Sequence, residues 1–171
     1  MTLIVIIKIL AIIILLLLSA LSSGSETALT AVSKQRAHRQ KDKGAKNANF
    51  ILKIKEFKDE FITGILLANN LFNILATALM TELLVSEFGG LGVSVATIFM
   101  TLMIVIFSEV TPKIFAINKP MTFALKVSKF FYFYTKLIKP IVNLINKVSN
   151  KIIKLIGLNL NADQSKIIEE E

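Results

Sequence analysis

Three long apolar stretches alternate with short polar segments along this chain. They cover residues 3–21, 61–85 and 93–107, and they consist mainly of isoleucine, leucine, valine, alanine and phenylalanine. A helix rises about 1.5 Å per residue, so about 20 apolar residues cross the roughly 30 Å hydrocarbon core of a bilayer. The pattern predicts an all-α membrane protein with three transmembrane helices, at about residues 3–32, 60–86 and 92–118.

The first apolar stretch has a second interpretation, a secretory signal cleaved near Ala20 or Ser22. Such a signal has a charged first region and a shorter apolar core. Here Lys8 lies inside the stretch, from where its side chain can extend to the interface, and the helical pattern continues through residues 25–29. We therefore expect an uncleaved helix.

The connecting segments differ in charge. Residues 33–58 contain nine lysines and arginines but two acidic residues, whereas residues 86–92 are short, acidic and rich in glycine. Basic loops of membrane proteins stay in the cytoplasm. This predicts an inner or plasma membrane protein whose N-terminus lies outside and whose C-terminus is cytoplasmic, with residues 86–92 forming an outer turn.

Two further segments mix apolar and basic residues at helical spacing. They predict amphipathic helices on the membrane surface over about residues 34–56 and 120–157, the second divided at Pro140. A fourth crossing over residues 121–145 is the alternative. Interfacial aromatic rings and lysines next to anionic headgroups suit the surface position. The side chains expected there are Lys126, Lys129, Lys136, Tyr132 and Tyr134.

Composition removes several function classes. The 171 residues carry a net charge of +8, no cysteine and one histidine, His38, within a basic segment. In a membrane protein, basic segments indicate the topology and contact with anionic lipid rather than binding of nucleic acid. No phosphate-binding glycine loop and no Ser/His/Asp set is present. The sequence therefore does not predict an enzyme.

The third stretch ends in an unusual way, at Glu109 and Pro112. A carboxylate at membrane depth costs roughly 2.5–3.5 kcal/mol, so it needs a partner. Pro112 has no N–H to donate to the Ser108 carbonyl, which is left free beside the carboxylate. Hard oxygens of this kind are the ligands preferred by Mg²⁺ and Ca²⁺.

Polar residues of all three predicted spans share one depth. At 1.5 Å per residue they lie on the order of 13–22 Å from the cytoplasmic boundary. Serines or asparagines four residues apart share a helix face, and Gly24 permits a break in the first helix as Pro112 does in the third. These oxygens predict a cation site. The candidate ligands are Ser19, Ser23, Asn69, Asn70, Asn73, Ser108 and Glu109.

Each signal also has a simpler explanation. Serines in membrane helices often donate to the carbonyl one turn back, and asparagines often bridge helices. Glu109 has Lys113 four residues away as a partner for an ion pair, and Glu26 has basic residues just beyond the first helix. The coincidence in depth favours the cation site over these separate explanations.

At these residues the sequence resembles the CorC/CNNM (cyclin M) magnesium transporters. Residues 19–28, S-A-L-S-S-G-S-E-T-A, resemble the family motif S-A-x-F-S-G-S-E-T-A. Residues 68–74, A-N-N-L-F-N-I, resemble G-N-N-L-V-N-I, and residues 107–113, F-S-E-V-T-P-K, resemble F-G-E-[IV]-x-P-K. The departures are Ala68 for glycine, Ser22 for phenylalanine and Ser108 for glycine.

The resemblance implies a homodimer of three-crossing protomers that exports Mg²⁺, driven by Na⁺ entry. By matching position, the ion would be held by Ser19, Ser23, Asn70 and Glu109, and less surely by Asn69 or Asn73. It also implies a cytoplasmic, nucleotide-binding CBS region. We expect residues 1–158 to form the transmembrane domain, and the polar, acidic residues 159–171 to begin the linker to that region.

The predicted mechanism is alternating access around the ion, with Gly24 and Pro112 as hinges. A different class of function, a cation-responsive membrane anchor that binds Mg²⁺ without moving it, fits the same residues. A basic membrane-perturbing protein is a third, which the ordered polar layer argues against.

Overall fold

The computed structural model describes residues 2–155, and every element within them is a helix. The expected linker at residues 159–171 lies outside the described residues. The elements are α1 (Thr2–Ala31), α2 (Lys34–Asp42), α3 (Ala48–Glu56), α4 (Lys58–Phe88), α5 (Leu91–Met103), the π-helix η1 (Ile104–Val110), α6 (Thr111–Asn118) and α7 (Pro120–Leu155).

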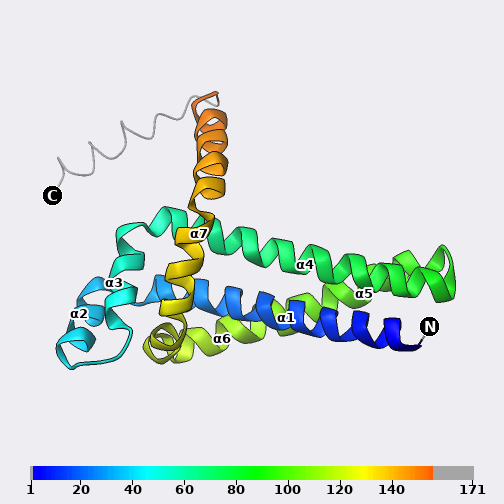
Figure 1. Ribbon diagram of the computed structural model, residues 1–171, viewed down its shortest axis with the longest axis horizontal. Coiled ribbons are helices and arrows are strands. Elements are labelled where there is room, and N and C mark those ends of the chain that lie inside the picture. The colour runs from blue at the N-terminus through cyan, green and yellow to red at the C-terminus, as the bar shows by residue number, and fades with distance from the viewer. Residues whose placement is uncertain (1, 156–171) are drawn as a thin grey trace.

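Three stretches of the described chain are helical, long and apolar enough to cross a membrane, which confirms the predicted spans. They are Leu3–Ala31, Lys58–Phe88 and Leu91–Asn118, the last made of α5, η1 and α6. Few residues of each span are buried within the protomer, as expected where lipid covers a helix. The alternative fourth crossing is not among them: α7 lies across one end of the bundle, steeply inclined to α1 and α4 (Figure 1).

The interior consists of two apolar clusters with polar residues between them. The larger cluster joins the end of α1 to α3, α4, α6 and α7, and includes Leu29, Ile51, Phe61 and Phe131. The smaller one, around Ile12, Ala76 and Met100, packs α1 against α4 and α5 nearer the other end. Buried side chains lie between the two clusters at Ser19, Ser22, Ser23, Ser25, Asn69 and Ser108. Apolar packing therefore fixes both ends of the polar layer.

α4 and α5 form a tight hairpin, which small residues make possible. Gly92 and Ala96 are buried one turn apart on α5, and Ala76 is buried on α4. A Cβ added at Gly92 would lie 2.3 Å from the Leu84 carbonyl oxygen, so the two backbones are in direct contact there. Small residues at helix interfaces allow this approach in membrane proteins.

The segment predicted as a surface helix at 34–56 is two helices, α2 and α3. Gly44 (φ 73°) and Asn47 (φ 70°) turn the chain between them. Asn47 is held in this left-handed conformation from both sides, because its Nδ2 donates to the Leu125 carbonyl at 3.0 Å and its own carbonyl accepts from Ser128 Oγ at 3.2 Å. Asparagine tolerates this conformation better than most residues. The turn is thereby attached to α7.

Lys55 supplies the positive charge that the end of α1 lacks. The last turn of α1 contains no basic residue, and the Lys55 Nζ donates to the Thr30 carbonyl at 3.2 Å. A cation at a helix C-terminus interacts favourably with the helix dipole. Burial, followed by the nearby charges of Lys58 and Lys34, lowers the pKa of Lys55.

The predicted division of the last segment at Pro140 is wrong. α7 is assigned as one helix from Pro120 to Leu155, with Pro140 inside it. A proline removes one backbone hydrogen bond, here the one to the Lys136 carbonyl. Both residues are exposed on the helix surface, where water can satisfy that carbonyl. The helix therefore continues through the proline.

At the other end of the bundle, Lys8 does not simply extend to the interface. Its Nζ lies 2.7 Å from a carboxylate oxygen of Glu82 on α4, with side-chain exposures of 25% and 63%. The pair joins α1 to α4 beyond the smaller apolar cluster.

We expect this ion pair to contribute little, about 0.5–1 kcal/mol, because Glu82 is largely exposed. A double-mutant cycle of Lys8→Met and Glu82→Gln, with unfolding followed in detergent micelles, measures the coupling directly. A coupling free energy of zero would show that the contact contributes nothing to the packing of α1 on α4.

Candidate functional site

The site lies where α1, α4 and η1 meet in the polar layer. Ser19 Oγ on α1 lies 2.5 Å from Asn69 Oδ1 and 2.6 Å from Asn73 Oδ1, both on α4. The hydroxyl has one hydrogen, so it can donate to only one of the two amide oxygens at a time. Three oxygen atoms thus lie close together and share a single hydrogen that can be donated. A bound cation would be attracted to all three oxygens.

Ser23, one turn along α1, faces the same layer. Its side chain is fully buried, and its Oγ has no hydrogen-bond partner among the described residues. A buried hydroxyl without a partner costs roughly 1–3 kcal/mol. Buried polar groups of folded proteins are nearly always paired, so this hydroxyl is available to a partner, a water or an ion, that the protomer itself does not supply.

The neighbouring serines behave differently. Ser22 Oγ donates to the Leu18 carbonyl at 2.9 Å, and Ser25 Oγ donates to the Leu21 carbonyl at 2.6 Å. These are the back-bonds that serine commonly makes in membrane helices. Back-bonding therefore accounts for Ser22 and Ser25 but not for Ser19 or Ser23. Ser19 instead meets two asparagines of α4, as expected for asparagines that bridge helices.

The break predicted at Pro112 takes the form of a π-helix. η1 spans Ile104–Val110, and the Thr111 N–H donates to the Ile106 carbonyl five residues back. Pro112 follows, without an N–H for either the Ser108 carbonyl four residues back or the Phe107 carbonyl five residues back. Short π-helical segments in α-helices are frequent at functional sites.

Two contacts place η1 and the beginning of α6 alongside the serines. Ser108 Oγ donates to the Leu16 carbonyl at 3.1 Å, and a Cβ added at Gly24 would lie 3.4 Å from the Pro112 carbonyl oxygen. These contacts bracket Ser19 and Ser23 on α1 and Glu109 on η1 within one slice of the bundle. The two expected hinges, Gly24 and Pro112, are therefore packed against each other.

Glu109 is half-buried in this slice. Among the described side chains, the ion pairs within 4.0 Å are Lys8–Glu82 and Lys139–Glu60. The alternative pairing of Glu109 with Lys113 is thus not formed, and Glu26 does not pair with the basic residues beyond α1 either. The Glu109 carboxylate is left available to a ligand.

The three asparagines do not lie together. Asn69 and Asn73 face Ser19, whereas Asn70 is exposed on the protomer surface. Asn70 was the asparagine favoured by position in the family motif, and nothing in the protomer brings it to the serines. Ser108 lies in the layer, but its hydroxyl is occupied by the Leu16 carbonyl.

One residue at the site was not anticipated. Phe123 of α7 covers Gly24: a Cβ added there would lie 2.9 Å from the Phe123 Cζ. The sequence carries no local signal for this contact, because the two residues meet only when α7 folds back across the bundle. The glycine and the ring close the layer on the side of α7.

The inventory of the layer limits its chemistry. Within residues 2–155, no three histidine, aspartate or glutamate side chains lie close enough together to hold a metal ion. The oxygens at this level belong to hydroxyls, to amides and, on η1, to one half-buried carboxylate, which are hard ligands of low total charge. Such sets suit Mg²⁺, Ca²⁺ or Na⁺ better than zinc or copper.

Comparison with known proteins supports a membrane role. The chain is 33% identical over 147 residues to a UPF0053 protein of Haemophilus influenzae and 31% identical over 147 residues to the UPF0053 inner membrane protein YfjD of Escherichia coli, in each case over 86% of this chain. It is 32% identical over 134 residues, 78% of this chain, to a putative DUF21 domain-containing chloroplastic protein of Arabidopsis thaliana. The matches span 35%, 34% and 20% of these relatives, so the chain covers about a third or less of their length.

A sequence profile of the family described as cyclin M transmembrane N-terminal domain matches residues 10–171. This match covers nearly the whole chain, and the three apolar spans agree with it. The chain is therefore a membrane protein, and it belongs to the cyclin M transmembrane domain family, as the resemblance at the three motifs implied.

Proposed function

We propose that this membrane domain moves Mg²⁺ across the bilayer by alternating access, holding the ion between α1, α4 and η1. The observation that carries the proposal is the buried, unpartnered Ser23 hydroxyl one turn from Ser19, whose hydroxyl already meets two amide oxygens. Ser19, Ser23, Asn69, Asn73 and Glu109 are the proposed ligands. A role for Asn70 stays a prediction.

The proposed site binds weakly, and this suits transport. Mg²⁺ gives up its water reluctantly and requires oxygens at about 2.0–2.1 Å in octahedral geometry. One carboxylate offsets half of its charge, so the ion keeps some water or requires a rigid cage. Modest affinity allows release on the far side.

The contact of Gly24 with Pro112 is the proposed moving joint. The break predicted at Gly24 is not formed, because α1 is one helix from Thr2 to Ala31; Gly24 instead lets the Pro112 backbone approach α1 closely. Hinges are commonly positions of this kind, where a few residues absorb a change in backbone angle. A shift of α1 along η1 and α6 would open the serine layer to one side of the membrane or the other.

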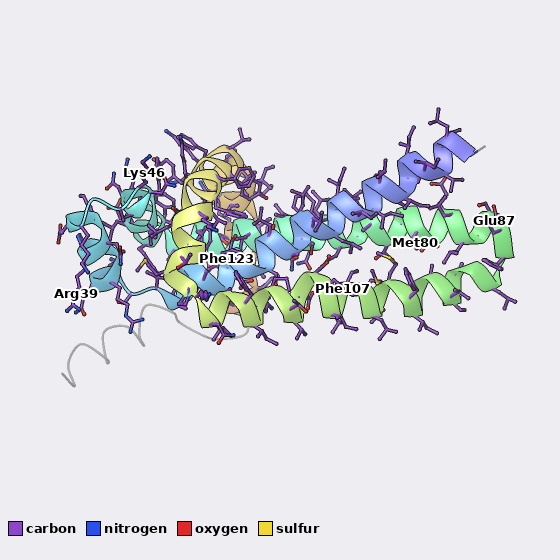
Figure 2. All side chains as sticks on the ribbon, turned by 90° about the horizontal axis from the view of Figure 1, so that it is seen from below. Arg39, Lys46, Met80, Glu87, Phe107 and Phe123 are labelled. Atoms are coloured by element: carbon purple, nitrogen blue, oxygen red, sulfur yellow. The ribbon has the colours of Figure 1, made fainter. Side chains whose placement is uncertain are left out.

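Orientation, coupling and assembly complete the proposal. Arg39 and Lys46 lie at the end of the molecule that carries α2 and α3, and Glu87 lies at the opposite end (Figure 2). By the positive-inside rule, the basic end is cytoplasmic and the N-terminus is outside. We further propose Mg²⁺ export coupled to Na⁺ entry by a homodimer whose cytoplasmic partner region is a CBS pair.

Ser23→Ala tests the site, and Ser22→Ala is its matched control. Both remove one hydroxyl from the same turn of α1, but only Ser23 lacks a partner. In proteoliposomes, Ser23→Ala should lower Mg²⁺ flux at limiting Mg²⁺ by more than about tenfold, and Ser22→Ala should stay within about twofold of wild type. Without Mg²⁺, Ser23→Ala should be more stable than wild type by about 1 kcal/mol, because an unpaired buried hydroxyl is removed.

The same preparations separate the competing functions. Equal Mg²⁺ flux in Ser23→Ala and Ser22→Ala would show that Ser23 is not a ligand and would refute the proposed site. A thermal shift caused by Mg²⁺ in wild type, without any flux, would instead identify the cation-responsive anchor. Leakage of an uncharged dye from the vesicles would identify a membrane-perturbing protein.

A further inference from the structure

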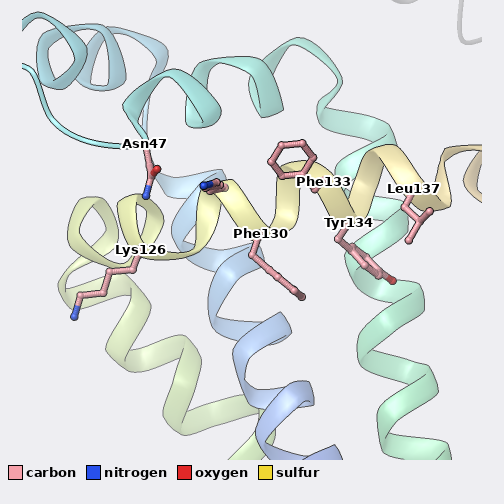
Figure 3. A pocket seen from close by; sticks show the side chains of 7 residues that line it. Asn47, Lys126, Phe130, Phe133, Tyr134 and Leu137 are labelled. Atoms are coloured by element: carbon pink, nitrogen blue, oxygen red, sulfur yellow. The ribbon is translucent and has the colours of Figure 1, made fainter.

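A cavity outside the polar layer lies between α7 and the turn that joins α2 to α3. Its volume is about 590 Å³, which is in the range of sites for small organic ligands. Its lining includes Asn47 of the turn and, on α7, two lysines and several large apolar side chains. Figure 3 shows α7 crossing above the ends of α1 and α4, with this group of side chains along it.

The polar part of the cavity is positively charged. Lys126 and Lys129 line it, no acidic residue does, and neither lysine is in the ion pairs formed among the described side chains. Both side chains are exposed. Two ammonium groups one turn apart, without a carboxylate, form a site for a phosphate rather than for a cation.

The remaining lining is apolar and open to the surroundings. Phe130 is 58% exposed and Leu137 is 78% exposed, although both are large apolar side chains. In Figure 3, the Phe130 and Tyr134 side chains extend from α7 in the direction of the spans α1 and α4, which is the direction of the bilayer interior. The cavity thus joins a charged end to an apolar face that points into lipid.

The walls of the cavity are fixed before any ligand binds. Asn47 is attached to α7 through the Leu125 carbonyl and the Ser128 hydroxyl. The Tyr134 hydroxyl donates to the Gly64 carbonyl on α4 at 3.2 Å. Gly64 also lets α7 pack closely on α4, because a Cβ added to it would lie 2.8 Å from Ile138 Cδ1 on α7. A preformed site loses less entropy when it binds.

We propose that this cavity binds one anionic glycerophospholipid, with the headgroup phosphate between Lys126 and Lys129 and an acyl chain along Phe130 and Leu137. Charge complementarity defines the headgroup end, and the apolar wall facing the bilayer favours a lipid over a purely soluble phosphate compound as the natural ligand. The bound lipid would connect α7 and the α2–α3 turn to α4 through Tyr134. This site is independent of the cation layer.

The test uses the purified full chain in neutral detergent micelles, titrated with phosphatidylglycerol while thermal unfolding is recorded. Wild type should show a saturable rise in Tm with phosphatidylglycerol. Phosphatidylcholine, and glycerol 3-phosphate without acyl chains, should each leave the Tm unchanged. The double variant Lys126→Gln/Lys129→Gln should require on the order of thirtyfold more phosphatidylglycerol for half of the effect.

The matched control is Lys147→Gln/Lys151→Gln, which removes the same charge from two exposed positions of the same helix outside this cavity. It should stay within about threefold of wild type. An equal loss in both double variants would show general attraction of a basic helix to anionic lipid and would overturn the site. An equal response to glycerol 3-phosphate would overturn the lipid assignment in favour of a soluble phosphate.

Discussion

Replacement of Glu109 by glutamine is expected to abolish the response of this domain to Mg²⁺. Glutamine keeps the size and one oxygen of the side chain but removes the charge. At an effective dielectric constant of about 20, a divalent ion about 4 Å from a carboxylate gains roughly 8 kcal/mol of Coulomb energy, part of which offsets the cost of dehydration. Even a third of that energy corresponds to about a hundredfold in affinity. We therefore expect at least that loss.

The measurement is the Mg²⁺-dependent thermal shift of the purified chain, repeated as flux in proteoliposomes. Glu87→Gln is the control, because it removes the same charge from an exposed position at the end of the bundle opposite α2 and α3. It should respond as wild type does. A normal Mg²⁺ response in Glu109→Gln would mean that Glu109 is not a ligand, and the carboxylate would then need another reason to lie in the spans.

The three membrane spans could be predicted because each is a long run of consecutive apolar residues, which can be read directly from the sequence. About twenty apolar residues in a row have few alternatives to a membrane helix, and the structure confirms all three. The depth of the polar residues followed from the same counting. The rotation of each helix about its own axis could not be predicted in this way. Adjacent polar residues offer more than one pair with helical spacing, and the sequence does not say which pair faces the other helices.

The asparagines illustrate this limit. Asn70 and Asn73 are three residues apart and Asn69 and Asn73 are four apart, so either pair can share a face. The fold selects Asn69 and Asn73, since the smaller apolar cluster places Ala76 against α1 and thereby orients α4. The buried Ala68 and Ala76 were the available signal, because small residues mark the side on which membrane helices meet.

The two prolines show why local chemistry alone misjudges a helix. Pro112 and Pro140 each remove one backbone donor, and a break was predicted at both. At Pro112 the chain is packed against Gly24 of α1, and η1 changes the hydrogen-bond register just before it. At Pro140 the surface is exposed, and α7 continues. Whether the hydrogen-bond pattern changes at a proline depends on what packs against it, and this packing is set by the tertiary structure.

The largest effect on stability is expected from Gly92→Ala, at the α4–α5 hairpin. The added methyl carbon would lie 2.3 Å from the Leu84 carbonyl oxygen and 2.6 Å from the Val85 nitrogen. Both are backbone atoms that cannot rotate away, so α5 has to move from α4. The move would also loosen Met100 in the smaller apolar cluster. We expect a loss of about 3 kcal/mol.

Gly90→Ala is the control for Gly92→Ala, since it adds the same methyl group two residues away. No atom lies within 4 Å of a Cβ at Gly90, and its φ of −59° suits any residue. Its stability should stay within about 0.5 kcal/mol of wild type or rise slightly, because alanine restricts the unfolded chain. In a thermal unfolding experiment in micelles, Gly92→Ala should melt about 5–10 °C below Gly90→Ala. Equal melting temperatures would show that α5 can shift along α4 at little cost, and the hairpin would then be a moving part rather than a fixed support of the polar layer.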